Sequence, residues 1–184
     1  MEQRPGFNLI EILLAVSFFV IVVLITSTMY IMAQNVYSRG SNQNELTQNA
    51  RVSLDRMSRE IRQAVELITD FSTSTPVNEI LFQDGHNTSK ITYIKYYLEG
   101  TDLKRSHLAY YFDFPQDPNI YVYIYSLDEN EDPPLEKELE DRIIAEYFQN
   151  LEFLNNNGLL QISIELGKDK ESLEIDTNIF IRNW

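Results

Sequence analysis

The sequence contains no cysteine among its 184 residues. This absence excludes disulfide bonds, thiolate metal sites and cysteine nucleophiles, but it leaves the redox compartment open, because extracytoplasmic proteins need not contain disulfides. Positive charge is also scarce, since 15 Lys and Arg residues stand against 28 Asp and Glu residues, giving a net charge of -13. Such a surface repels phosphate backbones and anionic lipid head groups, so we expect no direct nucleic-acid partner.

Motifs for catalysis and cofactor binding are missing as well. The sequence has no Gly-rich phosphate loop and no metal-ligand spacing, and its two histidines, His86 and His107, lack a spaced acid and nucleophile. Isolated histidines are usually surface or core residues. We therefore expect a protein that is not an enzyme and that needs no cofactor or metal.

One acidic segment imitates a calcium loop. Asp128, Asn130 and Asp132 match its opening, but Pro133 takes the sixth position, where glycine is required, and Leu139 takes the twelfth, where glutamate belongs. The segment is therefore not an EF-hand. A solvated loop is the simpler expectation, and a looser calcium site stays open as the alternative.

A long apolar run occupies the N-terminal part of the chain. Every residue from Leu9 to Ile25 is apolar or small except Glu11, and a weaker apolar stretch continues to Ala33. An ideal helix from Phe7 to Ala33 would be about 40 Å long, enough to cross a hydrocarbon core of roughly 30 Å. Since no Ala-x-Ala cleavage site follows the run, it is predicted to remain on the mature protein as a transmembrane helix.

Glu11 is the unusual residue of this run, because a carboxylate costs about 2.5 to 3.5 kcal/mol at the centre of a membrane helix and less near its end. Two explanations follow from the residues alone. Glu11 lies at the membrane surface and faces the positive end of the helix dipole, or it lies in the apolar region and needs a partner.

The setting of Glu11 favours the second explanation. The stretch Gly6, Phe7, Asn8, Leu9, Ile10, Glu11, followed at once by apolar residues, closely resembles the type IV prepilin (class III) signal. The resemblance implies that a prepilin peptidase cuts between Gly6 and Phe7 in the cytoplasm, that Phe7 becomes N-methylated, and that Glu11 neutralises the terminal amine of a neighbouring subunit during filament assembly. It also implies a single-pass protein of the bacterial inner membrane, with a cytoplasmic N-terminus and an extracytoplasmic head.

The helical pattern continues beyond the apolar run, over residues 34–70. Proline is absent from 34 to 68, and apolar residues recur every three or four positions, which predicts an amphipathic helix; they are Leu46, Ala50, Leu54, Met57, Ile61, Val65 and Ile68. The opposite, charged face is interpreted as solvated; it carries Arg51, Asp55, Arg56, Arg59, Glu60 and Arg62. With Gly40 as a candidate bend, the two halves predict one helix of roughly 60 residues, about 90 Å long.

Strand patterns fill the remainder, residues 71–184. We expect strands at Glu79–Gln83, Lys90–Leu98, Leu103–Phe112, Ile120–Leu127, Phe148–Leu154, Leu159–Leu166 and Leu173–Arg182, and a short helix at Glu136–Ala145. Asn157 and Gly158 predict a hairpin turn. Tyr121, Tyr123 and Tyr125 alternate with smaller residues, so they are predicted to share one sheet face, in the core or at an interface.

The predicted fold is therefore α+β: a leader at 1–6, a transmembrane half-helix at 7–33, an amphipathic half-helix at 34–70 and a β-rich head of mainly antiparallel strands at 71–184. The later part of the chain resembles the minor branch of the pilin-like family that includes pseudopilin J of type II secretion and minor pilin W. The residues that carry this resemblance are Ile94 and Tyr96 before Leu103, Lys104 and Arg105, the stretch Tyr147–Phe153 and the ending Thr177–Asn183. That resemblance implies a low-copy structural subunit of a type IV pilus or pseudopilus, which helps to start assembly at the filament tip.

The partners that this resemblance implies are the prepilin peptidase, other minor and major pilin-like subunits and the inner membrane. The alternative is a signal-anchored extracytoplasmic binding or adhesion domain that enters no filament. A simple anchor predicts a flexible Ser-, Gly- or Pro-rich linker after the membrane helix. The sequence continues instead with an unbroken helical pattern, which favours the pilin-like interpretation.

Overall fold

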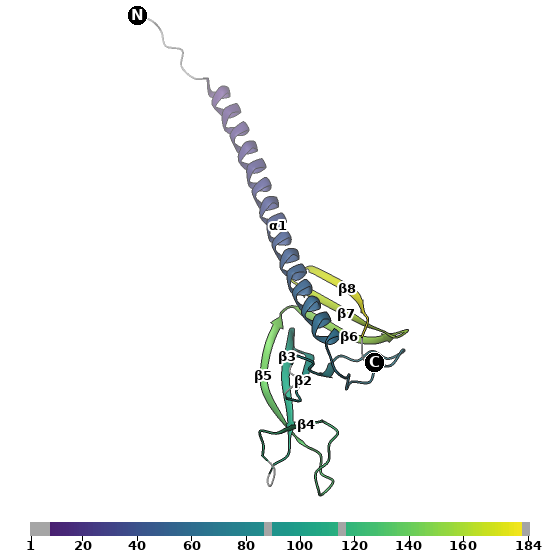
Figure 1. Cartoon of the computed structure of the whole chain (residues 1–184). Coiled ribbons are helices and arrows are strands. Elements are labelled where there is room, and N and C mark those ends of the chain that lie inside the picture. Colours follow the sequence, from purple (N-terminus) through teal and green to yellow (C-terminus); the bar gives the residue numbers. More distant parts are fainter. Residues whose placement is uncertain (1–7, 87–89, 114–116, 182–184) are drawn as a thin grey trace, which may run out of the picture. The chain divides into compact units, whose positions relative to one another are not determined.

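The uninterrupted apolar and helix-forming residues from position 9 onwards form one helix in the computed structural model, which describes residues 8–86, 90–113 and 117–181. This helix, α1, spans Leu9–Arg62. The strands that follow are β1 (Ile80–Gln83), β2 (Tyr93–Glu99), β3 (Asp102–Tyr111), β4 (Tyr121–Val122), β5 (Leu135–Ala145), β6 (Phe148–Asn156), β7 (Leu159–Lys168) and β8 (Glu171–Ile179) (Figure 1). The fold is α+β, as predicted.

The chain divides into two compact units between Asn42 and Gln43. In the described residues, unit 1 is the part of α1 up to Asn42, preceded by Asn8, and unit 2 contains the remainder of α1 and all strands. The helix continues through Gly40, where a bend was a candidate.

The helix ends earlier than the predicted boundary near residue 70. After Arg62 the backbone leaves the α-helical pattern: the N–H of Ala64 donates to the carbonyl of Ile61, three residues back. The N–H of Val65 then donates to Gln83 O, and that of Ile68 donates to Leu81 O. Hydrogen bonding to β1 therefore replaces the next helical turns, although the apolar spacing continues to residue 68.

Unit 2 contains two antiparallel sheets. In the first, β1, β2 and β3 are consecutive neighbours, β5 also pairs with β3, and the short β4 pairs with the end of β3. The second sheet has the order β6-β7-β8. The mainly antiparallel head that the sequence predicts is confirmed.

The core of unit 2 lies where α1 meets both sheets. Leu46, Ala50, Met57 and Ile61, four of the predicted apolar positions of the helix, are fully buried. They belong to one cluster with residues of both sheets, among them Ile80, Phe82, Tyr96, Leu103, Leu151, Phe153, Ile162 and Ile164. One face of α1 therefore fixes the two sheets against each other.

Two sequence predictions are wrong in this unit. Residues 136–145, expected as a short helix, lie in strand β5, because pairing with β3 from Tyr111↔Leu135 to Leu103↔Ala145 overrides the helical preference of its Glu residues. The strand expected over 120–127 is only Tyr121–Val122. The chain turns at once after it, with Ser126 N–H donating to Tyr123 O, so the three tyrosines do not share a sheet face.

Candidate membrane and assembly segment

The predicted assembly residue, Glu11, lies in the first turn of α1. Asn8 immediately precedes the helix, and its carbonyl accepts the N–H groups of Glu11 at 2.9 Å and Ile12 at 3.3 Å. Asn is a favoured residue before the first helical turn, and a carboxylate in that turn interacts favourably with the helix dipole. The predicted cleavage and methylation residues, Gly6 and Phe7, lie outside the described residues.

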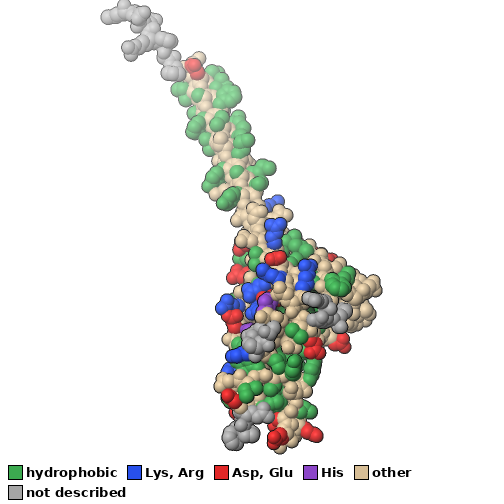
Figure 2. All heavy atoms as spheres, in the orientation of Figure 1, with side chains coloured by type: hydrophobic (Ala, Val, Ile, Leu, Met, Phe, Trp, Pro, Cys, Tyr) green, Lys and Arg blue, Asp and Glu red, His purple; other side chains and the backbone are tan. Residues whose placement is uncertain are grey.

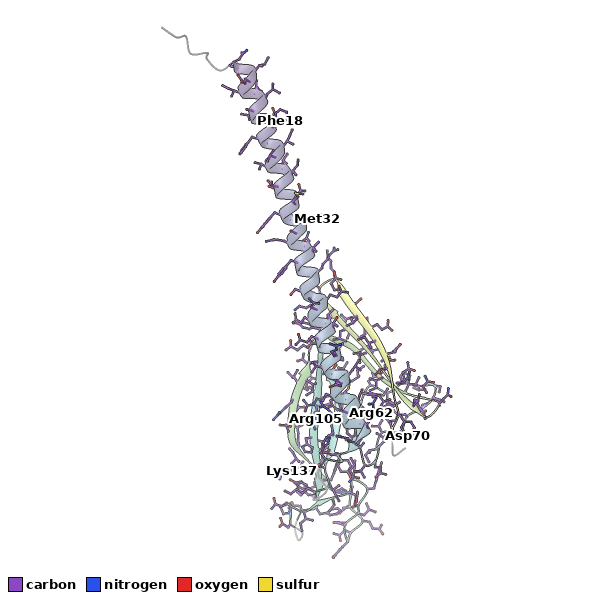
Figure 3. The ribbon with its side chains drawn as sticks, turned by 45° about the horizontal axis from the view of Figure 1, so that its top comes forward. Phe18, Met32, Arg62, Asp70, Arg105 and Lys137 are labelled. Atoms are coloured by element: carbon purple, nitrogen blue, oxygen red, sulfur yellow. The ribbon has the colours of Figure 1, made fainter. Side chains whose placement is uncertain are left out.

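The surface of unit 1 between Leu9 and Ala33 is apolar on all sides except at Glu11. Every residue from Leu9 to Ser41 is exposed, including bulky ones such as Phe18 and Met32, whose side chains project from the helix in Figure 3. Hydrophobic side chains cover this part of α1 in Figure 2, whereas charged side chains concentrate on unit 2. Among the described residues α1 alone is long and apolar enough to span a membrane. A helix that is apolar all round requires an apolar environment.

The polar side chains within this run are adapted to such an environment. The hydroxyls of Ser17, Thr26 and Thr28 donate to backbone carbonyls one turn earlier, at 2.8, 2.9 and 2.5 Å. Each hydroxyl hydrogen is thus satisfied within the helix, which removes most of the cost of placing it in lipid. Glu11 is the one charged residue between Leu9 and Ser38.

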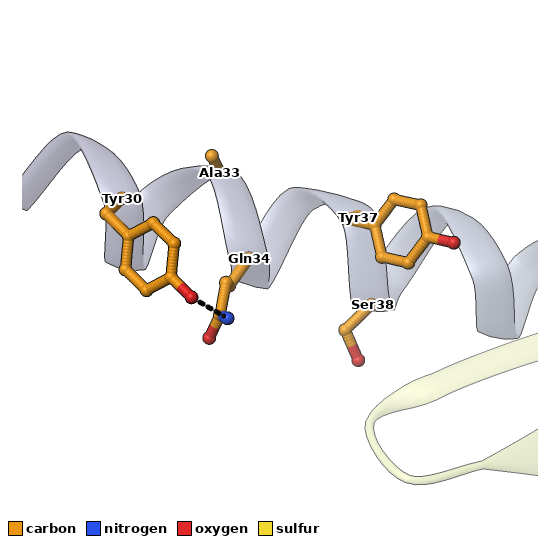
Figure 4. Close-up of a pocket in the computed structure, with 5 residues that line it drawn as sticks. All are labelled: Tyr30, Ala33, Gln34, Tyr37 and Ser38. Atoms are coloured by element: carbon orange, nitrogen blue, oxygen red, sulfur yellow. Dashed lines mark hydrogen bonds between the residues drawn. The ribbon is translucent and has the colours of Figure 1, made fainter.

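Two tyrosines mark the far end of the apolar run. Tyr30 accepts a 2.7 Å hydrogen bond from the amide of Gln34. Figure 4 shows these side chains on one side of α1 with Tyr37, around a shallow groove that Ala33 and Ser38 also line. Tyrosine favours the boundary between membrane and water. Because the helical rise from Leu9 to Tyr30 is about 32 Å, Tyr30 stands one hydrocarbon thickness from the start of α1.

Unit 2 contains a buried charge cluster that the sequence analysis missed. Glu60, expected on the solvated face of the helix, is only 9% exposed. Its carboxylate accepts hydrogen bonds from Arg105 Nε at 2.9 Å, Tyr96 OH at 2.7 Å and Arg56 Nε at 3.2 Å. Burial by itself would raise the pKa of Glu60, but the hydrogen bonds from Arg105 and Tyr96 outweigh it and lower that pKa. Of the three donors, only Arg56 lies close to Glu60 in the sequence.

The structure also brings together the two histidines. His86 Nδ1 lies 2.7 Å from Oδ1 of the buried Asp84, and His107 Nε2 lies 3.7 Å from its Oδ2. Burial, and then the charge of Arg105, lower the pKa of His107. Over the described residues no group of three or more His, Asp or Glu side chains is arranged to hold a metal ion.

The acidic segment after residue 127 is organised by its own hydrogen bonds. Asp128 Oδ1 accepts the backbone N–H groups of Asp132 and Asn130, both at 2.8 Å. These bonds, that of Asp132 first, lower the pKa of Asp128. The loop conformation therefore needs no bound ion to explain it.

Comparison with known proteins assigns no family: no family model, no curated protein and no solved structure matches this chain. Unit 1 combines a membrane-length apolar helix with one carboxylate in its first turn, and this combination is the candidate site.

Proposed function

We propose that this chain is a structural subunit of a type IV pilin-like filament, a minor pilin or pseudopilin that acts at the tip and helps to start assembly. It inserts into the inner membrane through residues 7–33, is cut between Gly6 and Phe7, and packs unit 1 beside the helices of related subunits. The observation that carries the proposal is the single carboxylate, Glu11, in the first turn of α1, in a stretch from Leu9 to Ser38 that is otherwise uncharged and fully exposed.

Electrostatics gives this carboxylate its role. None of the described residues forms an ion pair with Glu11, and its neighbours on α1 are apolar. A carboxylate in lipid is costly without a partner, and the free α-amine that cleavage creates on an adjacent subunit is a small cation at the same depth. The pairing of Glu11 with this amine determines how far neighbouring helices are shifted along their axes.

The first experiment determines the N-terminus of the membrane-extracted protein, with and without a co-expressed prepilin peptidase. We expect a peptidase-dependent chain that begins at Phe7 and carries one additional methyl group, as read by intact mass and N-terminal sequencing. A chain that still begins at Met1 or Glu2 beside an active peptidase would overturn the proposal in favour of the signal-anchored binding domain.

The second experiment tests Glu11 directly. Glu11→Lys subunits should insert into the membrane normally but fail to enter filaments, because two positive groups then meet at the contact. Asp55→Lys is the matched control, since it reverses an exposed carboxylate on the same helix in unit 2. Normal incorporation of the Glu11→Lys subunit, scored in sheared filament fractions, would show that amine pairing is wrong.

A further inference from the structure

Four large apolar side chains are exposed beside β4 in unit 2. Ile120 is 61% exposed, Tyr123 52%, Tyr125 67% and Leu127 61%. Single exposed apolar residues are ordinary on protein surfaces, but a group of them marks an interaction site more often. We call residues 120–127 the tyrosine segment.

The tyrosine segment is anchored, so this exposure is a fixed property of the fold. Val122 pairs with Tyr110 in the sheet. Val122 and Ile124 pack against the small core cluster of Tyr93, Leu108 and Tyr110, and the N–H of Ile124 donates to Tyr93 OH at 3.0 Å. With these two residues held inward, the intervening Tyr123 and the following Tyr125 face solvent.

The charges that flank the tyrosine segment along the sequence have one sign. No Lys or Arg occurs between Arg105 and Lys137, whereas the chain on both sides of the segment carries carboxylates, at Asp113, Asp117, Asp128, Glu129, Glu131 and Asp132. Figure 2 shows hydrophobic and acidic side chains together at the end of unit 2 where β4 lies. A second copy would bring the same negative charges to the contact, which disfavours self-association.

Tyr121 shows that a tyrosine of this segment can attract a cation within the protein itself. Lys90 Nζ lies 5.5 Å from the centroid of its ring, a distance at which a cation is attracted to the aromatic face. The neighbouring rings of Tyr123 and Tyr125 are exposed and take part in no aromatic or cation contact within the described residues.

We propose that the tyrosine segment and its acidic flanks form a docking surface for a cationic segment of another protein, in which Arg or Lys alternates with apolar residues. Tyrosine and arginine dominate the energetics of protein interfaces, and arginine stacks on tyrosine rings while it pairs with carboxylates. This surface does not depend on the proposed filament role, because it uses unit 2 alone.

The test uses the full chain in a non-ionic detergent and a short synthetic peptide of alternating Arg and Leu. We expect the peptide to bind, and a matched Glu and Leu peptide not to bind. The Tyr123→Ser, Tyr125→Ser double variant should weaken binding about tenfold, the loss typical of removing interface tyrosines. Phe180→Ser is the control, because Phe180 is 69% exposed but lies after β8; it should leave the affinity unchanged.

A second pair of variants separates local charge from net charge. Glu129→Lys with Glu131→Lys should weaken binding severalfold, whereas Glu174→Lys with Asp176→Lys, the same change in net charge placed on β8, should not. Equal losses in the two variants would mean that the peptide responds only to the overall charge of -13, and would overturn the proposal.

Cross-linking to the unaltered protein locates the contact even if the serine variant fails to fold. Since no Lys or Arg lies between Arg105 and Lys137, trypsin releases residues 106–137 as one fragment. A photoreactive Arg and Leu peptide should label this fragment above all others. Labelling that is stronger elsewhere on unit 2, or no labelling, would overturn the assignment.

Discussion

The carboxylate of Glu60, in the last turn of α1, accepts a 2.9 Å hydrogen bond from Nε of Arg105, in the middle of β3. Figure 3 shows Arg105 beside the end of the helix. Burial would lower the pKa of Arg105, but its hydrogen bond with Glu60 reverses the effect and raises that pKa. Each group thus stabilises the ionised form of the other, and the pair fixes the helix to the first sheet at one register.

Removing one partner should therefore be costly. We expect Glu60→Ala to lower the free energy of unfolding of unit 2 by about 3 kcal/mol, because Arg105 would stay buried with only the more distant carboxylate of Glu140, at 3.7 Å, as a counter-charge. Replacing both residues by Met should cost less than the sum of the single changes. Urea denaturation followed by circular dichroism measures all three variants.

The matched control for Glu60 is Asp55, one turn earlier on α1. Asp55 pairs with Arg59 at 3.9 Å, and both side chains are largely exposed, so Asp55→Ala should change the free energy of unfolding little. If Glu60→Ala were as mild as Asp55→Ala, the buried pair would not stabilise this fold.

His107 predicts a pH dependence of stability. Burial and the charge of Arg105 lower its pKa below the usual 6.5, against the opposing effects of Asp84 and Glu140. Between pH 6.5 and the lower pKa of the folded state, the unfolded chain binds a proton that the folded chain does not, so stability falls as the pH falls. The pKa of Glu60, lowered from 4.5, adds a loss only at still lower pH.

His107→Gln should reduce this dependence. Melting temperatures of the variant and the unaltered protein should run parallel above about pH 7 and diverge towards about pH 5, where the unaltered protein loses more. Identical slopes over this range would contradict the assignment to His107.

Local signals in the sequence predicted the parts of the fold that local interactions determine. The apolar run and the three-four spacing of Leu46, Ala50, Met57 and Ile61 predicted α1 and its buried face. The turn at Asn157 and Gly158 was also predicted, and both residues have the positive φ, 54° and 85°, that such a turn requires.

The errors arose where distant residues decide the outcome. Glu60 was expected to face solvent, because helix periodicity describes only residues within a few turns. Its partners Tyr96 and Arg105 lie 36 and 45 residues away in the sequence. Residues 136–145 are rich in charged residues, above all Glu, and only their pairing with β3 makes them a strand. Of the candidate site, the sequence predicted Glu11 near the start of the membrane helix, and the structure has it in the first turn of α1. The partner predicted for Glu11 would belong to another molecule.

Gly85 should tolerate no side chain. A Cβ there would lie 1.9 Å from the backbone oxygen of Gln63, so the chain after α1 would have to move away from the end of β1. Gly85→Ala should therefore destabilise unit 2 by about 1 to 3 kcal/mol. Gly40→Ala is the control, because a methyl group added at Gly40 would meet nothing within 4 Å; it should leave the melting temperature of unit 2 unchanged and increase helicity slightly. A melting temperature for Gly85→Ala equal to that of Gly40→Ala would show that the contact relaxes freely.

Unit 2 should fold without unit 1. All residues of its main core cluster lie between Leu46 and Ile181, and Lys168 Nζ binds Glu45 at 2.5 Å, just inside the boundary at Gln43. A chain of residues 43–184 should therefore stay in solution without detergent and melt within a few degrees of the full chain, because it loses no core contact. A chain of residues 50–184 is the comparison; it lacks Leu46 and Glu45 and should melt at a clearly lower temperature. If the 43–184 chain aggregated or showed no cooperative transition, unit 1 would be required for folding, and its exposed apolar surface would be explained in part by that requirement.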